Sequence, residues 1–342
     1  MRKYRKREHV ENYLRASHQG QALFEDVLLP NHSLPEMALE EVDTRLSFLG
    51  RDLDFPLMIN AMTGGTDFTE EINQSLAEIA RHFNLPIAVG SQTIAMEDEE
   101  AKRSFQVVRE VLGEDGIVLA NINPHLSLDQ AKKAVDMIQA NGLQIHLNPA
   151  QEMAMEEGDR DFRGLLKNIQ EIVEGLGLPV IVKEVGFGLS PEVIERLYQV
   201  GVRYVDVSGH GGSNFFEIED MRRPDIDMSD LFSWGLPTAY CIIKAKELGL
   251  EDLKIIGAGG IKSAQDLVKA LVLGSHMTAI SGELLTYLMY GGQMYAMEYV
   301  EALIYKTRMI MLLLGAKNLK DLWKVQWLAK GQLKDLIDQR PR

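Results

Sequence analysis

The residues best suited to chemistry lie in two glycine-rich stretches late in the sequence, residues 257–260 and 281–282. Glycine lets backbone amides come close to a phosphate group, and a helix N-terminus behind the glycines favours the anion. The two stretches therefore predict a phosphate-binding site. The hydroxyl groups of Ser208 and Ser213 are candidate hydrogen-bond donors to the same phosphate.

Four further positions place a short polar side chain or a cation just after an apolar run: Thr63, Ser91, Asn121 and Lys183. A flavin ring needs hydrogen-bond donors along its pyrimidine edge, and a nearby lysine stabilises negative charge on the reduced ring. The four positions therefore predict a cradle for a flat cofactor. A buried lysine paired with Glu184 or Asp206 is an equally open interpretation of Lys183.

Gln151 and Glu152 place one carboxylate beside a neutral amide after another apolar run. Mg²⁺ is often held by one or two carboxylates, with phosphate oxygens and water completing its shell. Glu152 is thus a candidate ligand that links Mg²⁺ to a diphosphate, and a carboxylate at a helix start is the alternative. His146 and Asn148 alternate along the same run and so point to one side. A lone histidine on a strand is more often structural than catalytic.

The N-terminus is basic: Arg2, Lys3, Arg5, Lys6 and Arg7 are followed by Glu8 and His9. The chain as a whole carries a formal net charge of −14. This argues against nucleic acid as the main partner, because phosphate backbones need a basic surface. The basic segment is either a solvated terminus or an arm that closes over an anionic ligand.

The composition narrows the class of protein. The chain has 342 residues and one cysteine, Cys241, which excludes an intrachain disulfide and a multi-cysteine zinc site. The longest apolar run, residues 309–314, is too short to span a bilayer. Residues 1–8 are charged and do not resemble a signal peptide. We therefore expect a cytoplasmic protein without a membrane partner.

Short apolar runs alternate with longer helical patterns, which is typical of a parallel sheet with helical crossovers. The predicted strands are residues 56–60, 86–90, 117–121, 143–148, 179–184, 204–208, 254–257 and 277–281. Eight such units predict an α/β fold, a TIM (β/α)8 barrel, whose phosphate site follows strands seven and eight. The two glycine-rich stretches lie there. A doubly wound open sheet is the alternative, but its phosphate loop normally follows the first strand.

We expect one domain over residues 1–342, divided into an N-terminal extension (1–53), the barrel (54–290) and C-terminal helices (291–342). Ser190 followed by Pro191 marks the start of a helix. Residues 293–314 and 317–330 are predicted to be helices. Residues 209–235 exceed a normal loop and predict either a lid or an insertion that builds the site.

Seven motifs occur in one order along nearly the whole chain, at residues 5–9, 62–65, 90–92, 146–152, 183–186, 209–214 and 257–260. Together they closely resemble the type 2 isopentenyl-diphosphate isomerases. The resemblance implies an enzyme that interconverts isopentenyl and dimethylallyl diphosphates with reduced FMN and Mg²⁺, NADPH supplying the reduction. It also implies a homotetramer or homooctamer.

By this resemblance, the residues that contact FMN would be Met62, Thr63, Gly64, Ser91, Asn121, Lys183, Ser208, Ser213, Gly257, Ala258, Gly259, Ala279 and Ile280. The residues that face the substrate would be Arg5, Lys6, His9, His146, Asn148 and Gln151. Glu152 would hold the metal. Gln151, His146 and Glu219 are the candidate catalytic residues, with Glu219 as a proton relay. The family commonly has an arginine where this chain has Thr93.

Two other classes remain as alternatives. A different FMN barrel enzyme would be either a 2-hydroxy acid oxidase, with a histidine base and an arginine, or a nucleotide dehydrogenase with a catalytic cysteine in a loop. Neither set is evident, since Cys241 falls in a predicted helix. A phosphate-binding barrel without catalytic activity is the second alternative.

Overall fold

Eight parallel strands close into a barrel in the computed structural model, which describes residues 2–17, 20–223 and 225–339. The strands are β4 (Leu57–Ile59), β5 (Ile87–Ala88), β6 (Val118–Ile122), β7 (Gly142–His146), β8 (Val180–Lys183), β9 (Tyr204–Asp206), β10 (Lys254–Gly257) and β11 (Met277–Ile280). Neighbours in chain order pair in parallel, and β11 pairs with β4 to close the ring. The predicted TIM barrel and its eight strands are confirmed, and the open sheet is wrong.

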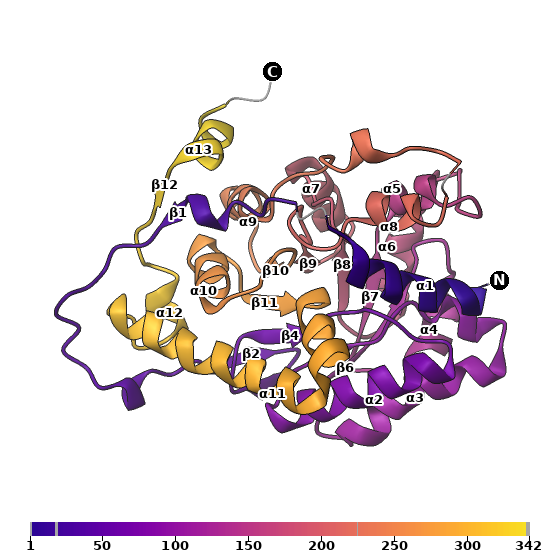
Figure 1. The fold of residues 1–342 in the computed structure, drawn as a ribbon, viewed down its shortest axis with the longest axis horizontal. Coiled ribbons are helices and arrows are strands. Elements are labelled where there is room, and N and C mark those ends of the chain that lie inside the picture. The colour runs from indigo at the N-terminus through magenta and orange to yellow at the C-terminus, as the bar shows by residue number, and fades with distance from the viewer. Residues whose placement is uncertain (1, 18–19, 224, 340–342) are drawn as a thin grey trace.

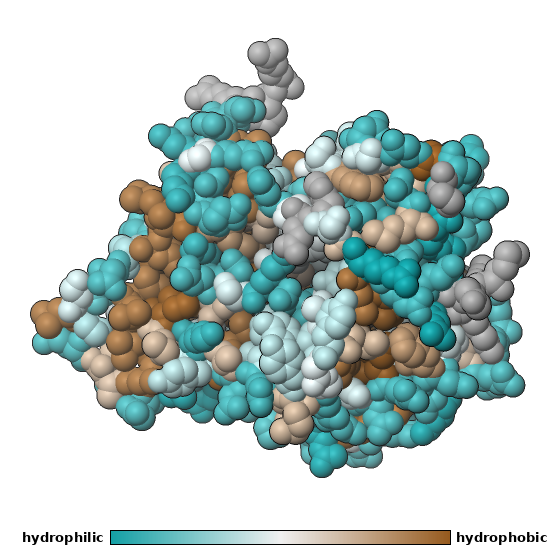
Figure 2. Space-filling view, in the orientation of Figure 1, coloured by the Kyte–Doolittle hydropathy of each residue, from teal (hydrophilic) through white to brown (hydrophobic). Residues whose placement is uncertain are grey.

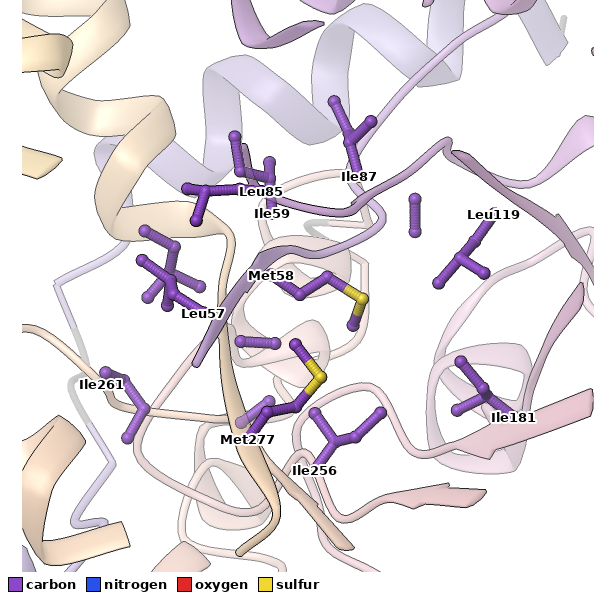
Figure 3. Packing of buried hydrophobic residues seen from close by; sticks show 14 of the residues in the cluster. Leu57, Met58, Ile59, Leu85, Ile87, Leu119, Ile181, Ile256, Ile261 and Met277 are labelled. Carbon is purple, nitrogen blue, oxygen red and sulfur yellow. The ribbon is translucent and has the colours of Figure 1, made fainter. Parts of the chain in front are cut away.

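Apolar side chains fill the barrel interior beneath its carboxyl end. Figure 3 shows Met58 and Met277 pointing toward one another inside the ring, while Leu57 and Ile59 point to the other face of β4. All four side chains are buried, because helices cover the outside of the strands. The alternation along β4 directs Asn60, the next residue, into the interior as well. Above Met58 the barrel core therefore becomes polar.

Helices surround the strands, as Figure 1 shows. They are α2 (Asp67–His82), α3 (Arg103–Leu112), α4 (Leu128–Met137), α5 (Pro149–Ala154), α6 (Leu165–Gly175), α7 (Pro191–Gln199), α8 (Phe215–Asp220), α9 (Thr238–Glu247), α10 (Ala264–Leu273) and α11 (Gly282–Leu313). Ser190 caps α7 by accepting from the Val193 N–H, as the sequence predicts. Among the described residues no helix is long and apolar enough to cross a membrane.

In the described part of the extension before the barrel lie the α-helix α1 (Arg2–Arg15) and the short strands β1 (Val27–Leu28), β2 (Leu46–Phe48) and β3 (Arg51–Leu53). After the barrel, α11 is interrupted at Gly292, whose φ of 77° is not helical. The predicted helix over 293–314 is the part of α11 beyond this break. Within residues 309–314, Met311 is buried, whereas Met309 and Leu313 are exposed.

The predicted helix over 317–330 is wrong. Only α12 (Leu319–Leu322) is helical there, and β12 (Leu328–Ala329) then pairs antiparallel with β1 before α13 (Gly331–Asp338) begins. Asp26 completes this junction, since its carbonyl accepts from the Lys330 N–H and its carboxylate from the Leu333 N–H. These partners lie about 300 residues away in sequence, so local pattern does not reveal them.

Candidate functional site

A cavity of about 1300 Å³ opens at the carboxyl ends of the strands, the face on which TIM barrels carry their active sites. The segments after all eight strands contribute to its wall, together with α1. Figure 2 shows the strongly hydrophilic α1 lying across this face. The predicted site residues that line the cavity are Arg5, Lys6, His9, Met62, Thr63, Ser91, Asn121, His146, Asn148, Gln151, Glu152, Lys183, Ser208, Ser213, Ala258, Gly259, Ala279 and Ile280.

Three predicted residues lie outside the cavity wall. A side chain at Gly64 would meet the Phe105 ring, and one at Gly257 would meet the Ser275 hydroxyl, so both glycines serve packing between strand and helix. Glu219 is fully buried on α8 and contacts His9, which itself lines the cavity. The side chains of Arg2 and Lys3 lie outside the described part of the chain.

At the end of the cavity where the sequence predicts a phosphate site, two glycine loops are in close contact. Gly259 has a φ of +95°, and a Cβ there would lie 2.2 Å from the Gly209 carbonyl oxygen. Gly212 packs against Gly259, with its Cβ position 3.1 Å from the Gly259 Cα. The N-terminus of α11 at Gly282 lines the same cavity. Glycine backbone beside a helix N-terminus suits an anion.

Ser208 is oriented differently from the expectation. It has a left-handed φ of 28°, and both its N–H and its hydroxyl donate to Oδ1 of Asp206, at 3.0 and 2.7 Å. Because the hydroxyl hydrogen is used within the protein, Ser208 offers the cavity an acceptor oxygen. The expectation of a hydroxyl donor at this position is therefore wrong.

Lys183 is held by backbone and not by an acidic side chain. Its Nζ donates to the Glu184 carbonyl oxygen at 2.5 Å, and among the described residues it has no carboxylate partner. The ammonium keeps two further N–H bonds for a ligand. Of the two interpretations of Lys183, the pairing with the carboxylates of Glu184 or Asp206 is wrong.

The Glu184 carboxylate instead organises the loop after β8. Its Oε2 accepts from the backbone N–H groups of Val185, Gly186, Phe187 and Gly188, at 2.7, 2.8, 2.6 and 3.2 Å. Burial raises the pKa of Glu184 to about 7, although the N–H groups of Phe187, Gly186 and Val185 and the charge of Lys183 act in the opposite direction. One buried oxygen thus fixes the turn whose carbonyl holds Lys183.

Replacing Glu184 with alanine is expected to lower the free energy of unfolding by about 3–5 kcal/mol, because buried N–H groups would lose their acceptor. Glu184→Gln keeps an acceptor oxygen and is expected to lose less. Urea unfolding of the two variants measures the difference. Equal stability of wild type and Glu184→Ala would show that the loop does not depend on this carboxylate.

His146 is a neutral imidazole in this site. Burial, followed by the charges of Lys183 and Lys6, lowers its pKa to about 3, against a smaller opposing effect of the Ile122 carbonyl. Its Nδ1 lies 2.6 Å from Oδ1 of Asn121. Near neutral pH the ring therefore acts as a hydrogen-bonding group and not as a cation.

Asn148, Gln151 and Glu152 form one cluster where β7 meets α5. Nδ2 of Asn148 donates to Oε1 of Gln151 at 3.1 Å and to Oε1 of Glu152 at 2.9 Å. The Asp159 N–H donates to the other oxygen of Glu152 at 2.9 Å. No group of three or more His, Cys, Asp or Glu residues suited to a metal occurs in the described part of the chain. A metal here would thus have Glu152 as its protein carboxylate and take other ligands from substrate and water.

The basic segment is a helix that docks over the cavity, so the interpretation as a solvated terminus is wrong for Arg5, Lys6 and His9, whereas Arg7 is exposed to solvent. Nη1 of Arg5 pairs with Glu157 at 3.2 Å, and Nζ of Lys6 lies 3.5 Å from the Ser91 carbonyl oxygen. Lys6 therefore reaches the loop that carries Thr93, which also lines the cavity. Nε2 of His9 lies 2.8 Å from Oε1 of Glu219.

Arg222, which the sequence did not single out, holds this helix in place. It pairs with Glu8 of α1 at 3.1 Å, with Glu157 at 3.0 Å and with the buried Glu219. Burial opposes ionisation of Glu219, but His9 and Arg222 outweigh it and lower its pKa. Arg222 lies in the segment 209–235, which builds the cavity wall. The feature of the sequence that pointed to this region was the unusual length of the segment 209–235.

Replacing Arg222 with methionine is expected to weaken substrate binding about tenfold, since α1 would lose its link to α8 while charged groups remain buried. FMN affinity is expected to change little. Titration with inorganic diphosphate and with FMN separates the two effects. Arg223→Met is the matched control, because Arg223 pairs with Asp225 and does not line the cavity. An equal effect of the two substitutions would contradict the role of Arg222.

Comparison with known proteins agrees with this geometry. A family model described as FMN-dependent dehydrogenase matches residues 118–328. An isopentenyl-diphosphate delta-isomerase of Geobacillus sp. is 42% identical over 337 residues, which cover 98% of this chain and 96% of that protein. One of Symbiobacterium thermophilum is 44% identical over 343 residues, covering 97% and 93%.

Solved structures show the same fold at low sequence identity. A mandelate oxidase variant with (S)-mandelic acid superposes with a TM-score of 0.69 at 16% identity, covering 96% of this chain and 97% of that one. A mandelate oxidase variant with a monooxide FMN adduct gives 0.66 at 17% identity, covering 94% and 92%. At these identities the likeness establishes the barrel architecture alone.

Proposed function

The chain belongs to the isopentenyl-diphosphate delta-isomerase family, and we propose that it converts isopentenyl diphosphate to dimethylallyl diphosphate with reduced FMN, Mg²⁺ and NADPH. The observation that carries the proposal is one cavity with two ends whose residues suit an anion. One end, the glycine contact around Gly259, would hold the FMN phosphate, and the other, α1 with Arg5 and Lys6, would hold the diphosphate.

The residues between these ends fit a flavin ring. Oγ1 of Thr63 is buried and has no hydrogen-bond partner among the described residues, which suits a contact with a ligand. Lys183 would direct its free N–H bonds at the ring, and Ser91 and Met62 would border it. Cys241, by contrast, is buried on α9, and burial raises the pKa of its thiol, which disfavours a cysteine-dependent dehydrogenase.

Moving the double bond requires a proton to be added at one carbon and removed from another. The reduced flavin, when bound, would supply an electron-rich ring able to donate the first proton and accept the second. Gln151 and His146 would border the reacting carbons and exclude water. Glu219 would exchange protons with the cavity through His9. A neutral His146 suits this role, since an imidazolium would repel the developing carbocation.

The diphosphate would lie between α1 and the cluster after β7. Arg5 and Lys6 would neutralise its charge, and Asn148 would orient Glu152 as the ligand of Mg²⁺. By family resemblance the enzyme would be a cytoplasmic homotetramer or homooctamer in isoprenoid biosynthesis, without a nucleic acid or membrane partner.

The direct test is anaerobic incubation of the protein with FMN, dithionite, Mg²⁺ and isopentenyl diphosphate, followed by NMR detection of the dimethylallyl isomer. We expect product only when the flavin is reduced and Mg²⁺ is present. A protein loaded with reduced FMN that forms no isomer would overturn the proposed activity. Failure to bind FMN at all would instead favour the non-catalytic phosphate-binding barrel.

A further inference from the structure

A row of mostly buried polar side chains crosses the barrel at the floor of the cavity and joins His146 to Asp206. Nδ1 of His146 lies 2.6 Å from Oδ1 of Asn121, and Nδ2 of Asn121 donates to Oε1 of Gln144 at 3.3 Å. Nε2 of Gln144 donates to Oδ1 of Asn60 at 3.0 Å, and Nδ2 of Asn60 donates to Oδ2 of Asp206 at 2.6 Å. The four bonds run through β6, β7, the end of β4 and β9.

The direction of this row is determined at the Asp206 end. Oδ1 of Asn60 also accepts the backbone N–H of Ala61 at 2.9 Å, and a backbone N–H only donates. The oxygen of Asn60 must therefore face Ala61 and Gln144, and its nitrogen must face Asp206. The Asp206 carboxylate accepts three hydrogen bonds from described residues, since Ser208 provides two in addition to that of Asn60.

Each amide then passes its orientation to the next. Because the Asn60 oxygen accepts from Gln144, the Gln144 nitrogen is used there and its oxygen must accept from Asn121. The Asn121 nitrogen is in turn used on Gln144, so its oxygen faces His146. An oxygen acceptor in this position requires hydrogen on Nδ1 of the imidazole.

We propose that Asp206 is a positioning residue that fixes His146 in its Nδ1–H tautomer through Asn60, Gln144 and Asn121. The ring nitrogen left to a ligand in the cavity is then Nε2, which carries a lone pair. The tautomer is independent of the proposed function, whereas the use of Nε2 toward a diphosphate substrate rests on it.

Because these groups are buried, the amides of the row can change their orientation only together. Asn60, Asn121, Gln144 and Asp206 are each at most 3% exposed, so a reversed amide would face a neighbour of its own kind without water to replace the lost bond. The layer below, with Met58 and Met277, is apolar. A polar layer costs more to bury than an apolar one, which points to a role in the site and not in stability.

The test is the tautomer of His146 in protein labelled with ¹⁵N-histidine, read from the ring nitrogen shifts at pH 7.5 and assigned with His146→Gln. Wild type is expected to show the Nδ1–H form in about tenfold or greater excess. Asp206→Asn keeps its oxygen toward Ser208 and places a donor opposite the Asn60 nitrogen, while the Ala61 N–H still holds the Asn60 oxygen, so the excess of the Nδ1–H form should fall. His82, which is exposed on α2, serves as an internal reference.

Gln144→Met cuts the row at its centre and provides the control. Gln144→Met alone should reduce the preference of His146 for one tautomer. In the double variant Gln144→Met/Asp206→Asn, the second substitution should have no further effect on the tautomer. If Asp206→Asn fails to fold, the loss of preference in Gln144→Met still decides the proposal. An unchanged His146 tautomer in either folded single variant, or an Asp206→Asn effect that persists without Gln144, would overturn it.

Discussion

Replacement of Gly259 by alanine is expected to weaken FMN binding by about two orders of magnitude or more. The left-handed φ of +95° is unfavourable for any residue with a side chain, and the new Cβ would lie 2.2 Å from the Gly209 carbonyl oxygen. The two glycine loops would have to separate, which would displace the amides that we assign to the FMN phosphate. Fluorescence quenching of FMN on titration with protein measures the loss.

Gly249→Ala is the matched control for that variant. Gly249 also has a positive φ, of +60°, but a Cβ there would meet nothing within 4 Å. It therefore carries the same kind of backbone strain without the clash, and its FMN affinity should stay near that of wild type. Normal FMN binding by a folded Gly259→Ala protein would move the phosphate site away from this contact.

Removal of residues 1–7 is expected to weaken diphosphate binding about a hundredfold or more while FMN binding stays nearly intact. The deletion removes Arg5 and Lys6, and charge-assisted hydrogen bonds contribute about 1.5–3 kcal/mol each. The FMN-phosphate end has no contact with these residues in the proposed arrangement. Calorimetric titration with inorganic diphosphate in the presence of Mg²⁺ measures the first affinity, and FMN titration measures the second.

Two point variants separate charge from helix docking in that experiment. Arg5→Ala with Lys6→Ala should reproduce most of the loss, because α1 stays attached through Glu8 and Arg222. Arg7→Ala should have a smaller effect, since its guanidinium pairs with Glu11 on the same helix at 2.7 Å. Equal losses of diphosphate and FMN affinity would mean that the segment is structural and does not bind substrate.

The amino-acid sequence alone determined the architecture and most of the cavity wall. Apolar runs at regular spacing predict eight strands, and a barrel places the residue after each strand at one end. That rule was enough to bring Thr63, Lys183 and Gly259 into one site. The rule works because strand burial and glycine conformation depend on the local sequence, so a sequence pattern is enough to predict them.

Only the tertiary structure decided which atoms of these residues remain available. Ser208 gives its hydroxyl hydrogen to Asp206, and Lys183 is held by a carbonyl. Asn60 and Asp206 are 146 residues apart, yet their hydrogen bond directs the polar row. Hydrogen-bond direction depends on every neighbour at once, and those neighbours come from different strands. For this reason the sequence was enough to locate the site, whereas only the fold determined which of its polar atoms donate and which accept hydrogen bonds.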